Sequence, residues 1–86
     1  MSGPSALVEA IARALVDKPE WIAVSERTTR GTTFLDVALA PEDLGRLIGR
    51  QGRTAQAIRA LVAVIAETEG RRIEVDFREG AAPERG

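Results

Sequence analysis

Cysteine, histidine and tyrosine are absent from this 86-residue sequence, and its aromatic residues are one tryptophan and two phenylalanines. Without cysteine there is neither a disulfide framework nor a thiolate metal site. Without histidine, the usual zinc sites and histidine-based acid–base catalysis are excluded as well. No serine has a histidine to activate it, and Lys18 is the single lysine. The composition therefore predicts a protein that is not an enzyme and needs no metal or cofactor, with a carboxylate-only site as the one arrangement left open.

Long hydrophobic runs are missing too. No apolar stretch approaches the roughly 20 residues that span a bilayer, and the first residues lack the basic start and apolar run of a signal peptide. Apolar residues make up 44% of the chain and charged residues 29%, enough to build and solvate one small core. We therefore expect a single cytoplasmic domain with no membrane partner and no small-molecule substrate.

The chain has no net positive charge overall, but its positive charge is concentrated in one place. The formal net charge is −1, with −3 on residues 1–43, +4 on residues 44–63 and −2 on residues 64–86. The charges of the middle segment all come from arginines, namely Arg46, Arg50, Arg53 and Arg59. A local patch of this kind attracts an anion even when the whole protein is slightly acidic, and arginine suits forked phosphate contacts.

The first half of the chain predicts a helix followed by a hairpin. Apolar residues recur at helical spacing over residues 5–17, and Pro19 ends that pattern. Residues 21–28 and 33–39 have the composition of strands, with a turn at Gly31 between them. Leu35, Val37 and Leu39 share one face of the second strand, whose high apolar content suits the centre of a sheet.

The second half predicts two helices and a last strand. A helix over 41–48 ends at Gly49 as a C-cap glycine, and a longer helix follows Gly52 to residue 69. Alternation predicts a half-buried strand over 72–78. The apolar stripe of the longer helix comprises Ile58, Leu61, Val62 and Ile65.

The predicted element order is therefore α-β-β-α-α-β. The first two strands pair antiparallel, and the third returns through a right-handed helical crossover to lie parallel to one of them. With the helices on one face of this three-stranded mixed sheet, the fold class is a two-layer α+β domain. We expect the domain to cover residues 5–78, between a flexible N-terminus (1–4) and a flexible tail (79–86).

The Gly49-Arg50-Gln51-Gly52 turn has two interpretations. It can simply join two helices, as glycines do in many helical hairpins. Alternatively, its glycines let a sugar-phosphate chain approach the backbone, where N–H groups at the start of the next helix point at phosphate. As a bare pattern Gly-x-x-Gly is weak, so its context decides.

The context is the stretch VALAPEDLGRLIGRQGRTAQAIRALV, residues 37–62, within the α-β-β-α-α-β order. It resembles a KH domain, whose GxxG loop holds about four nucleotides of single-stranded RNA, in the prokaryotic type II arrangement. It is also similar to the small bacterial stand-alone KH proteins of the KhpA family, and the likeness covers residues 5–78. The Arg-Gln pair stands where Lys-Gln is frequent in that family, so the charge is retained.

The resemblance implies a function and partners. It implies an RNA-binding protein that acts as an RNA chaperone or post-transcriptional regulator, self-associates as a homodimer and pairs with a larger KH protein, KhpB (also called Jag or EloR). It also implies a link to cell-envelope homeostasis and cell length, that is, to cell shape and cell wall organisation. None of this is visible in composition or spacing.

The resemblance also assigns site residues. The RNA-binding loop and its entry are Ile48, Gly49, Arg50, Gln51 and Gly52. Nearby phosphate candidates are Arg46, Arg53 and Arg59. An aliphatic groove beside the loop would take the bases, and Ile73 or Val75 either contributes to it or belongs to the core.

The aromatic residues do not form a base-stacking platform of the RRM or OB type. Phe77 lies on the apolar face of its strand, while Trp21 and Phe34 either pack at the core edge or mark a self-association patch. Two other functions stay open. A helix-turn-helix DNA-binding protein fits the hairpin and the last strand poorly, and a protein-interaction module with a vestigial loop is opposed only by Arg50, where an acid would mark a dead loop.

Overall fold

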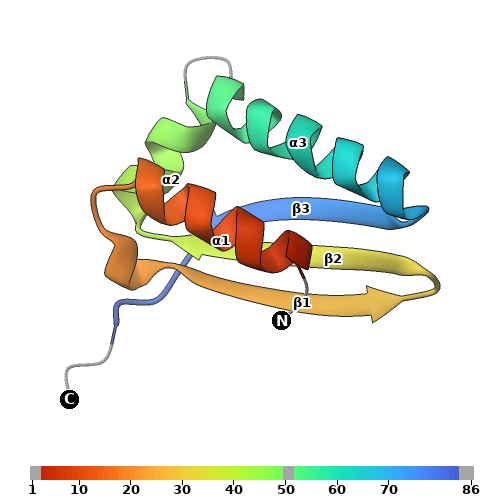
Figure 1. Ribbon diagram of the computed structural model, residues 1–86. Coiled ribbons are helices and arrows are strands. Elements are labelled where there is room, and N and C mark those ends of the chain that lie inside the picture. Colours follow the sequence, from red (N-terminus) through yellow and green to blue (C-terminus); the bar gives the residue numbers. More distant parts are fainter. Residues whose placement is uncertain (1–2, 50–51, 84–86) are drawn as a thin grey trace.

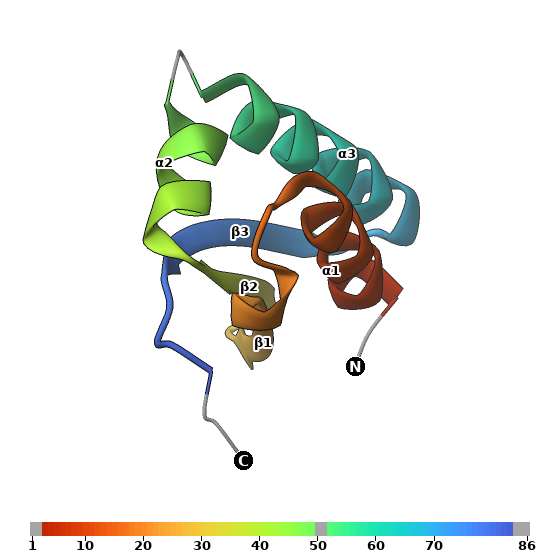
Figure 2. The same cartoon turned by 90° about the vertical axis from the view of Figure 1, so that its left-hand side faces the viewer.

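The computed structural model describes residues 3–49 and 52–83. Its elements are α1 (Gly3–Leu15), the 3₁₀ turn η1 (Pro19–Trp21), β1 (Ala23–Thr29), β2 (Thr32–Leu39), α2 (Pro41–Ile48), α3 (Arg53–Glu69) and β3 (Arg72–Glu79). The helices lie on one face of the sheet (Figures 1 and 2). The predicted two-layer α+β fold and its element order are confirmed.

The sheet has the order β1-β2-β3. β1 pairs antiparallel with β2, and β2 pairs parallel with β3, so β2 is the central strand as predicted. The hairpin between β1 and β2 turns at Arg30 and Gly31, whose φ angles are 50° and 80°. Two positive φ angles in a row define a type I′ turn, whose twist matches the strands it joins.

The core lies between the sheet and the helices, and β2 is its centre. Leu35, Val37 and Leu39 are fully buried, as the shared face predicts. They pack in a single cluster with side chains from every helix and from β3; its other members are Val8, Ala12, Ile22, Leu47, Ala55, Ile58, Val62 and Val75. A continuous core of this kind fixes both ends of the crossover that carries α2 and α3.

The buried face of α3 is narrower than its sequence predicts. Ile58 and Val62 are buried, but Leu61, a member of the predicted apolar stripe, is 41% exposed. The buried positions are Ala55, Ile58, Val62 and Ala66, spaced by three or four residues along one face. Leu61 lies next to that face and points out of the core.

The helix boundaries differ most at the N-terminus. α1 begins at Gly3, two residues before the predicted start, because proline is accommodated in a first helical turn. Pro4 and Ser5 are buried there, within the segment expected to be flexible or just beyond it. The helix ends at Leu15 and not at residue 17.

The first strand was predicted to begin too early. Trp21 lies in η1, and Ile22 donates its N–H to the Pro19 carbonyl at 3.0 Å. Because proline fixes φ for a tight helical turn, the chain turns once more before it extends. At the other end, β3 continues to Glu79, one residue beyond the prediction.

Within the described part of the chain, no helix is both long and apolar enough to cross a membrane.

Candidate nucleic-acid interface

The turn between α2 and α3 is the candidate site. The ends of both helices that flank it project away from the sheet (Figure 2). Gly49 donates its N–H to the Gly45 carbonyl at 2.7 Å, and Gly52 donates its N–H to the Gly49 carbonyl at 3.1 Å. The turn is therefore closed by backbone bonds. Arg50 and Gln51, on which part of the prediction depends, lie outside the described residues.

Gly49 ends α2, but not in the left-handed conformation usual for a C-cap glycine. Its φ is −70° and its ψ is 169°, an extended conformation that other residues adopt as well. The requirement for glycine is one of space. A Cβ at Gly49 would overlap the Gly45 carbonyl oxygen, which already accepts the Gly49 N–H.

Gly52 needs to be glycine for the opposite reason. Its φ of 61° and ψ of 30° lie in the left-handed region, whereas a Cβ there would meet no atom within 4 Å. As the N-cap of α3 it has no side chain to bond the first helical N–H groups, and the first turn of α3 contains no acid. The positive end of the α3 dipole is thus open to an external anion.

Two further predicted site residues border the turn. Ile48, the last residue of α2, is 49% exposed, so an aliphatic side chain lies at the surface beside Gly49. Arg53 is the first residue of α3 and is exposed. An apolar and a cationic side chain therefore border the same turn.

Arg59 is directed to the sheet. Its Nε donates to the Val75 carbonyl of β3 at 3.1 Å, and its guanidinium carbon lies 5.3 Å from the centre of the Phe77 ring. A cavity of about 170 Å³ follows this seam between α3 and β3. Its lining residues are Arg59, Val62, Ile73, Glu74 and Val75.

Of the two predicted groove residues, Val75 is buried in the core and Ile73 is only partly buried. Both also border the cavity at the α3–β3 seam. Both side chains therefore belong to the core and also line a cavity at the place where the core reaches the surface.

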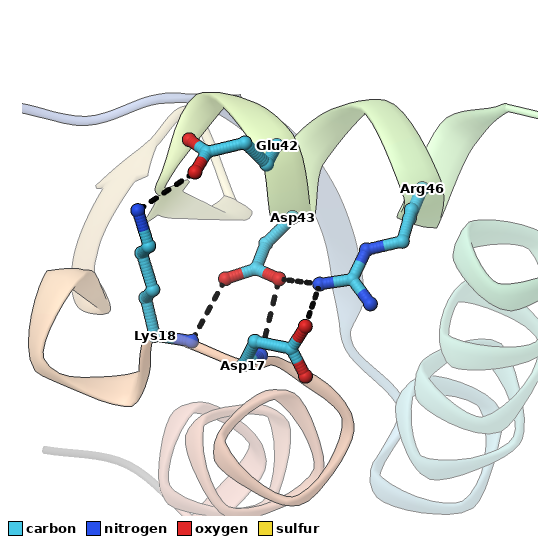
Figure 3. Close-up of polar contacts among 5 residues, drawn as sticks. All are labelled: Asp17, Lys18, Glu42, Asp43 and Arg46. Atoms are coloured by element: carbon cyan, nitrogen blue, oxygen red, sulfur yellow. Dashed lines mark hydrogen bonds and ion pairs between the residues drawn. The ribbon is translucent and has the colours of Figure 1, made fainter.

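Arg46 lies on the side of α2 that faces the end of α1, where it forms ion pairs. It contacts Asp17 Oδ2 at 2.8 Å and also pairs with Asp43 (Figure 3). Arg46 and Arg59 therefore do not converge, since Arg46 is held near the end of α1 while Arg59 is held on β3.

Asp43 is the residue that sequence reasoning missed. An acid in the first turn of a helix usually lies at the surface and complements the helix dipole, yet Asp43 is 3% exposed. Its carboxylate accepts the backbone N–H of Asp17 at 3.1 Å and that of Lys18 at 3.0 Å, in addition to the Arg46 contact (Figure 3). These partners lie 26 and 25 positions away, so no local pattern indicates them.

The ionisation of this cluster follows from its contacts. Burial alone would raise the pKa of Asp43, but the two backbone N–H groups and the Arg46 guanidinium outweigh it and lower the pKa. Next to it, Lys18 Nζ bonds Glu42 Oε2 at 2.7 Å at the surface, which raises the pKa of Lys18 and lowers that of Glu42. All of these groups are charged at neutral pH.

Among residues 3–49 and 52–83, no group of three carboxylates is placed to hold a metal ion.

A three-stranded mixed sheet, helices on one face and a glycine-bounded turn between two helices define the class of KH domains. A family model described as KhpA/KhpB, KH domain, matches residues 5–77. The chain therefore belongs to the KhpA/KhpB family of KH domains.

Individual relatives agree with this assignment. The chain is 44% identical over 71 residues to the RNA-binding protein KhpA of Clostridium acetobutylicum, covering 83% of this chain and 95% of the relative. It is 46% identical over 71 residues, with the same coverage, to the protein of that name from Caldanaerobacter subterraneus. With the one from Streptomyces coelicolor it shares 41% identity over 70 residues, 81% of this chain and 85% of the relative.

Proposed function

We propose that this protein binds single-stranded RNA through the Gly49–Gly52 turn and catalyses no reaction. The observation that carries the proposal is the turn itself. Gly49 lets the chain leave α2 in close backbone contact with Gly45. Gly52, the N-cap of α3, leaves the first N–H groups of that helix without a side-chain cap. Relatives that cover most of the chain are named RNA-binding proteins, which supports the same partner.

In this proposal the phosphates lie against the turn. The first N–H groups of α3 and the helix dipole favour an anion, and the side chains of Arg50 and Arg53 add charge-assisted contacts. Gln51 completes the loop. Arg46 and Arg59 contribute positive charge nearby, with guanidinium groups that the protein already holds in place.

The bases would lie on the aliphatic side of the turn. Ile48 is exposed beside Gly49, and the seam between α3 and β3 provides a cavity lined partly by Ile73 and Val75. Such a surface favours bases through apolar contact, so we expect a loose sequence preference and modest affinity for one domain.

The test is a double substitution, Arg50→Asp with Gln51→Asp, after circular dichroism has confirmed the fold. Short RNA and DNA oligomers are titrated at two salt concentrations. We expect the wild type to bind RNA with an affinity that falls as salt rises, and the double variant to lose binding. A control with the same change in net charge, Thr29→Asp with Arg30→Asp at the hairpin turn, should retain binding.

The outcomes separate the alternatives. RNA binding that survives in the double variant would contradict the loop assignment. Preference for duplex DNA would favour the helix-turn-helix interpretation. A wild type that binds no RNA but remains self-associated would favour an interaction module.

We also propose self-association as a homodimer through the outer faces of α1 and α3. Exposed aliphatic side chains follow both helices: Leu7 at 37%, Leu15 at 54%, Leu61 at 41% and Val64 at 61%. Between them lies a cavity of about 160 Å³ with a mainly apolar lining. Its lining residues are Ile11, Leu15, Thr54, Ala57, Ile58 and Leu61.

A second copy suits this surface because none of the exposed aliphatic residues or cavity-lining residues named above is charged. Since one family model describes the KH domains of both KhpA and KhpB, a KhpB (Jag/EloR)-type protein is the proposed second partner. Leu61→Glu should produce a monomer by light scattering without unfolding the chain, whereas Ala63→Glu serves as a control for added charge. A Leu61→Glu variant that stays dimeric would exclude this surface.

The physiological role that we propose is that of a cytoplasmic RNA chaperone linked to cell-envelope homeostasis and cell length. Its support is family membership. Cell length and RNA stability in a strain that carries the loop variant would test it.

A further inference from the structure

α2 has few means of holding its place. It is eight residues long, and the only buried residues in it are Asp43 and Leu47. Leu44 adds a half-buried contact with the core. One of the two fully buried anchors of this helix is therefore a carboxylate and not an apolar group.

That carboxylate attaches α2 to the linker between α1 and η1. Asp43 Oδ1 and Oδ2 accept the N–H groups of Asp17 and Lys18, two consecutive residues of the linker. Arg46, one helical turn later, pairs with Asp43 and with Asp17 Oδ2, which closes a ring between helix and linker (Figure 3). Hydrogen bonds in two directions fix the rotation of α2 as well as its distance from α1.

The other end of the same helix is Gly49. A helix of eight residues is about 12 Å long, and a tilt of about 10° at one end moves the other by about 2 Å. The Gly49 N–H bond to the Gly45 carbonyl joins the turn directly to the last helical residues. A change in the position of Asp43 is therefore transmitted to Gly49 through α2, which is short and rigid.

We propose that Asp43 is a positioning residue for RNA binding, which sets the pose of the Gly49–Gly52 turn by fixing α2 to the α1–η1 linker. The inference rests on the proposed function of the turn. Asp43 itself does not touch RNA, because it is buried on the α1 side of α2.

The test compares Asp43→Asn with two controls. Asparagine keeps the size of the side chain but has only one acceptor oxygen for two linker N–H groups. Glu42→Gln changes the neighbouring acid, whose contact with Lys18 is at the surface. Val8→Ala weakens the core at α1, away from α2, and so controls for a mere loss of stability.

The first readout is the pair of amide NMR signals of Gly49 and Gly52 in the free protein, recorded well below the unfolding transition. We expect both signals to shift in Asp43→Asn while the signal of Val37 in β2 stays in place. In Glu42→Gln and Val8→Ala the glycine signals should remain where they are in the wild type. Unmoved glycine signals in a folded Asp43→Asn protein would overturn the proposal.

The second readout is RNA affinity. We expect a loss of about tenfold in Asp43→Asn, because a displaced turn loses preorganised phosphate contacts, and no loss in the controls. Unchanged affinity in Asp43→Asn would also overturn the proposal. If the wild type itself binds no RNA, the proposed function fails, while the glycine signals still decide whether Asp43 positions the turn.

Arg46→Ala keeps the proposal testable if Asp43→Asn does not fold. It leaves the buried carboxylate with its two backbone donors and removes only the outer contact, so we expect smaller glycine shifts in the same direction. An affinity loss with unmoved glycine signals would make Arg46 a direct phosphate contact and contradict a positioning role for this ring.

Discussion

The two ends of α2 are held by opposite means. At its N-terminal end, the Asp43 carboxylate receives two backbone N–H groups from a distant linker. At its C-terminal end, Gly49 and Gly52 close the turn with backbone hydrogen bonds. One end is therefore sensitive to the loss of side-chain atoms and the other to their addition. The proposed binding surface lies at the end where side chains are smallest, which is where another backbone can approach.

The largest loss of stability is expected from removing the Asp43 side chain at the N-terminal end of α2. Asp43→Ala leaves two linker N–H groups without their acceptor, and each buried donor left unpaired costs about 1–3 kcal/mol. We expect the free energy of unfolding, measured with urea, to fall by about 3 kcal/mol. The exposed acid Asp76 provides the comparison, since Asp76→Ala should change little. Equal effects of the two substitutions would show that the buried carboxylate is not an anchor.

Acid should weaken the same end without a mutation. Because the pKa of Asp43 is lowered in the folded protein, its ionised form stabilises the fold at pH values above about 4, where the unfolded carboxylate is also charged. That stabilisation is lost as the pH falls through the folded pKa. The difference in unfolding free energy between wild type and Asp43→Asn should be large at pH 7 and shrink below about pH 4. A difference that stays constant with pH would contradict the assignment.

At the C-terminal end of α2, Gly49→Ala should destabilise the protein more than Gly52→Ala does. The new methyl group would overlap the Gly45 carbonyl oxygen, a backbone atom that can move only with the helix. Overpacking of this kind costs about 1–3 kcal/mol, and we expect RNA affinity to fall as well. Gly45→Ala makes the same chemical change in open space one turn earlier. It should stabilise the helix by about 0.5–1 kcal/mol, and destabilisation there would mean that the contact is misassigned.

Gly52→Ala should cost less, because only the backbone conformation opposes it. The left-handed region disfavours alanine by about 1–2 kcal/mol, and no neighbour lies within 4 Å of the added Cβ. Asparagine tolerates this region better, so Gly52→Asn should be milder than Gly52→Ala in thermal unfolding. The reverse order would point to crowding at Gly52 in place of conformational cost.

The smallest effect is expected from Glu42→Gln. Its ion pair with Lys18 is exposed at both partners, and surface pairs contribute little. The midpoint of thermal unfolding should stay nearly unchanged and should depend little on salt. A large shift of the unfolding midpoint would mean that Glu42 also anchors α2, so that two carboxylates and not one would hold its N-terminal end.

Local patterns predicted the parts of the fold that depend on neighbouring residues. The bounds of α2 follow from Pro41 at its start and Gly49 at its end, and the buried face of β2 follows from its alternation. The predictions failed where local signals compete. Pro4 was taken for part of a frayed end although proline fits a first helical turn, and Pro19 starts a 3₁₀ turn that takes Trp21 out of the strand.

In the candidate site, too, sequence predicts the features that depend on neighbouring residues and misses those that depend on distant ones. The turn and its two glycines can be located from sequence, but their separate reasons cannot, because the clash at Gly49 depends on where the Gly45 carbonyl points. The anchoring of Asp43 depends on backbone donors from a distant segment and leaves no trace in residue type. For Arg46 and Arg59 the sequence shows charge but not the partners that orient it.

The parallel pairing of β2 with β3 has a consequence for the order of folding. Partners in the β1–β2 hairpin are as close as Thr29 and Thr32, whereas Thr32 meets Arg72 only across the whole crossover. Local contacts form fast, and pairing across a long chain segment is slow because loop closure costs entropy first. α2, the turn and α3 lie inside that segment. We therefore expect the seam between α3 and β3 to assemble late in folding, and a chain still emerging from the ribosome to lack the complete seam until β3 has been made.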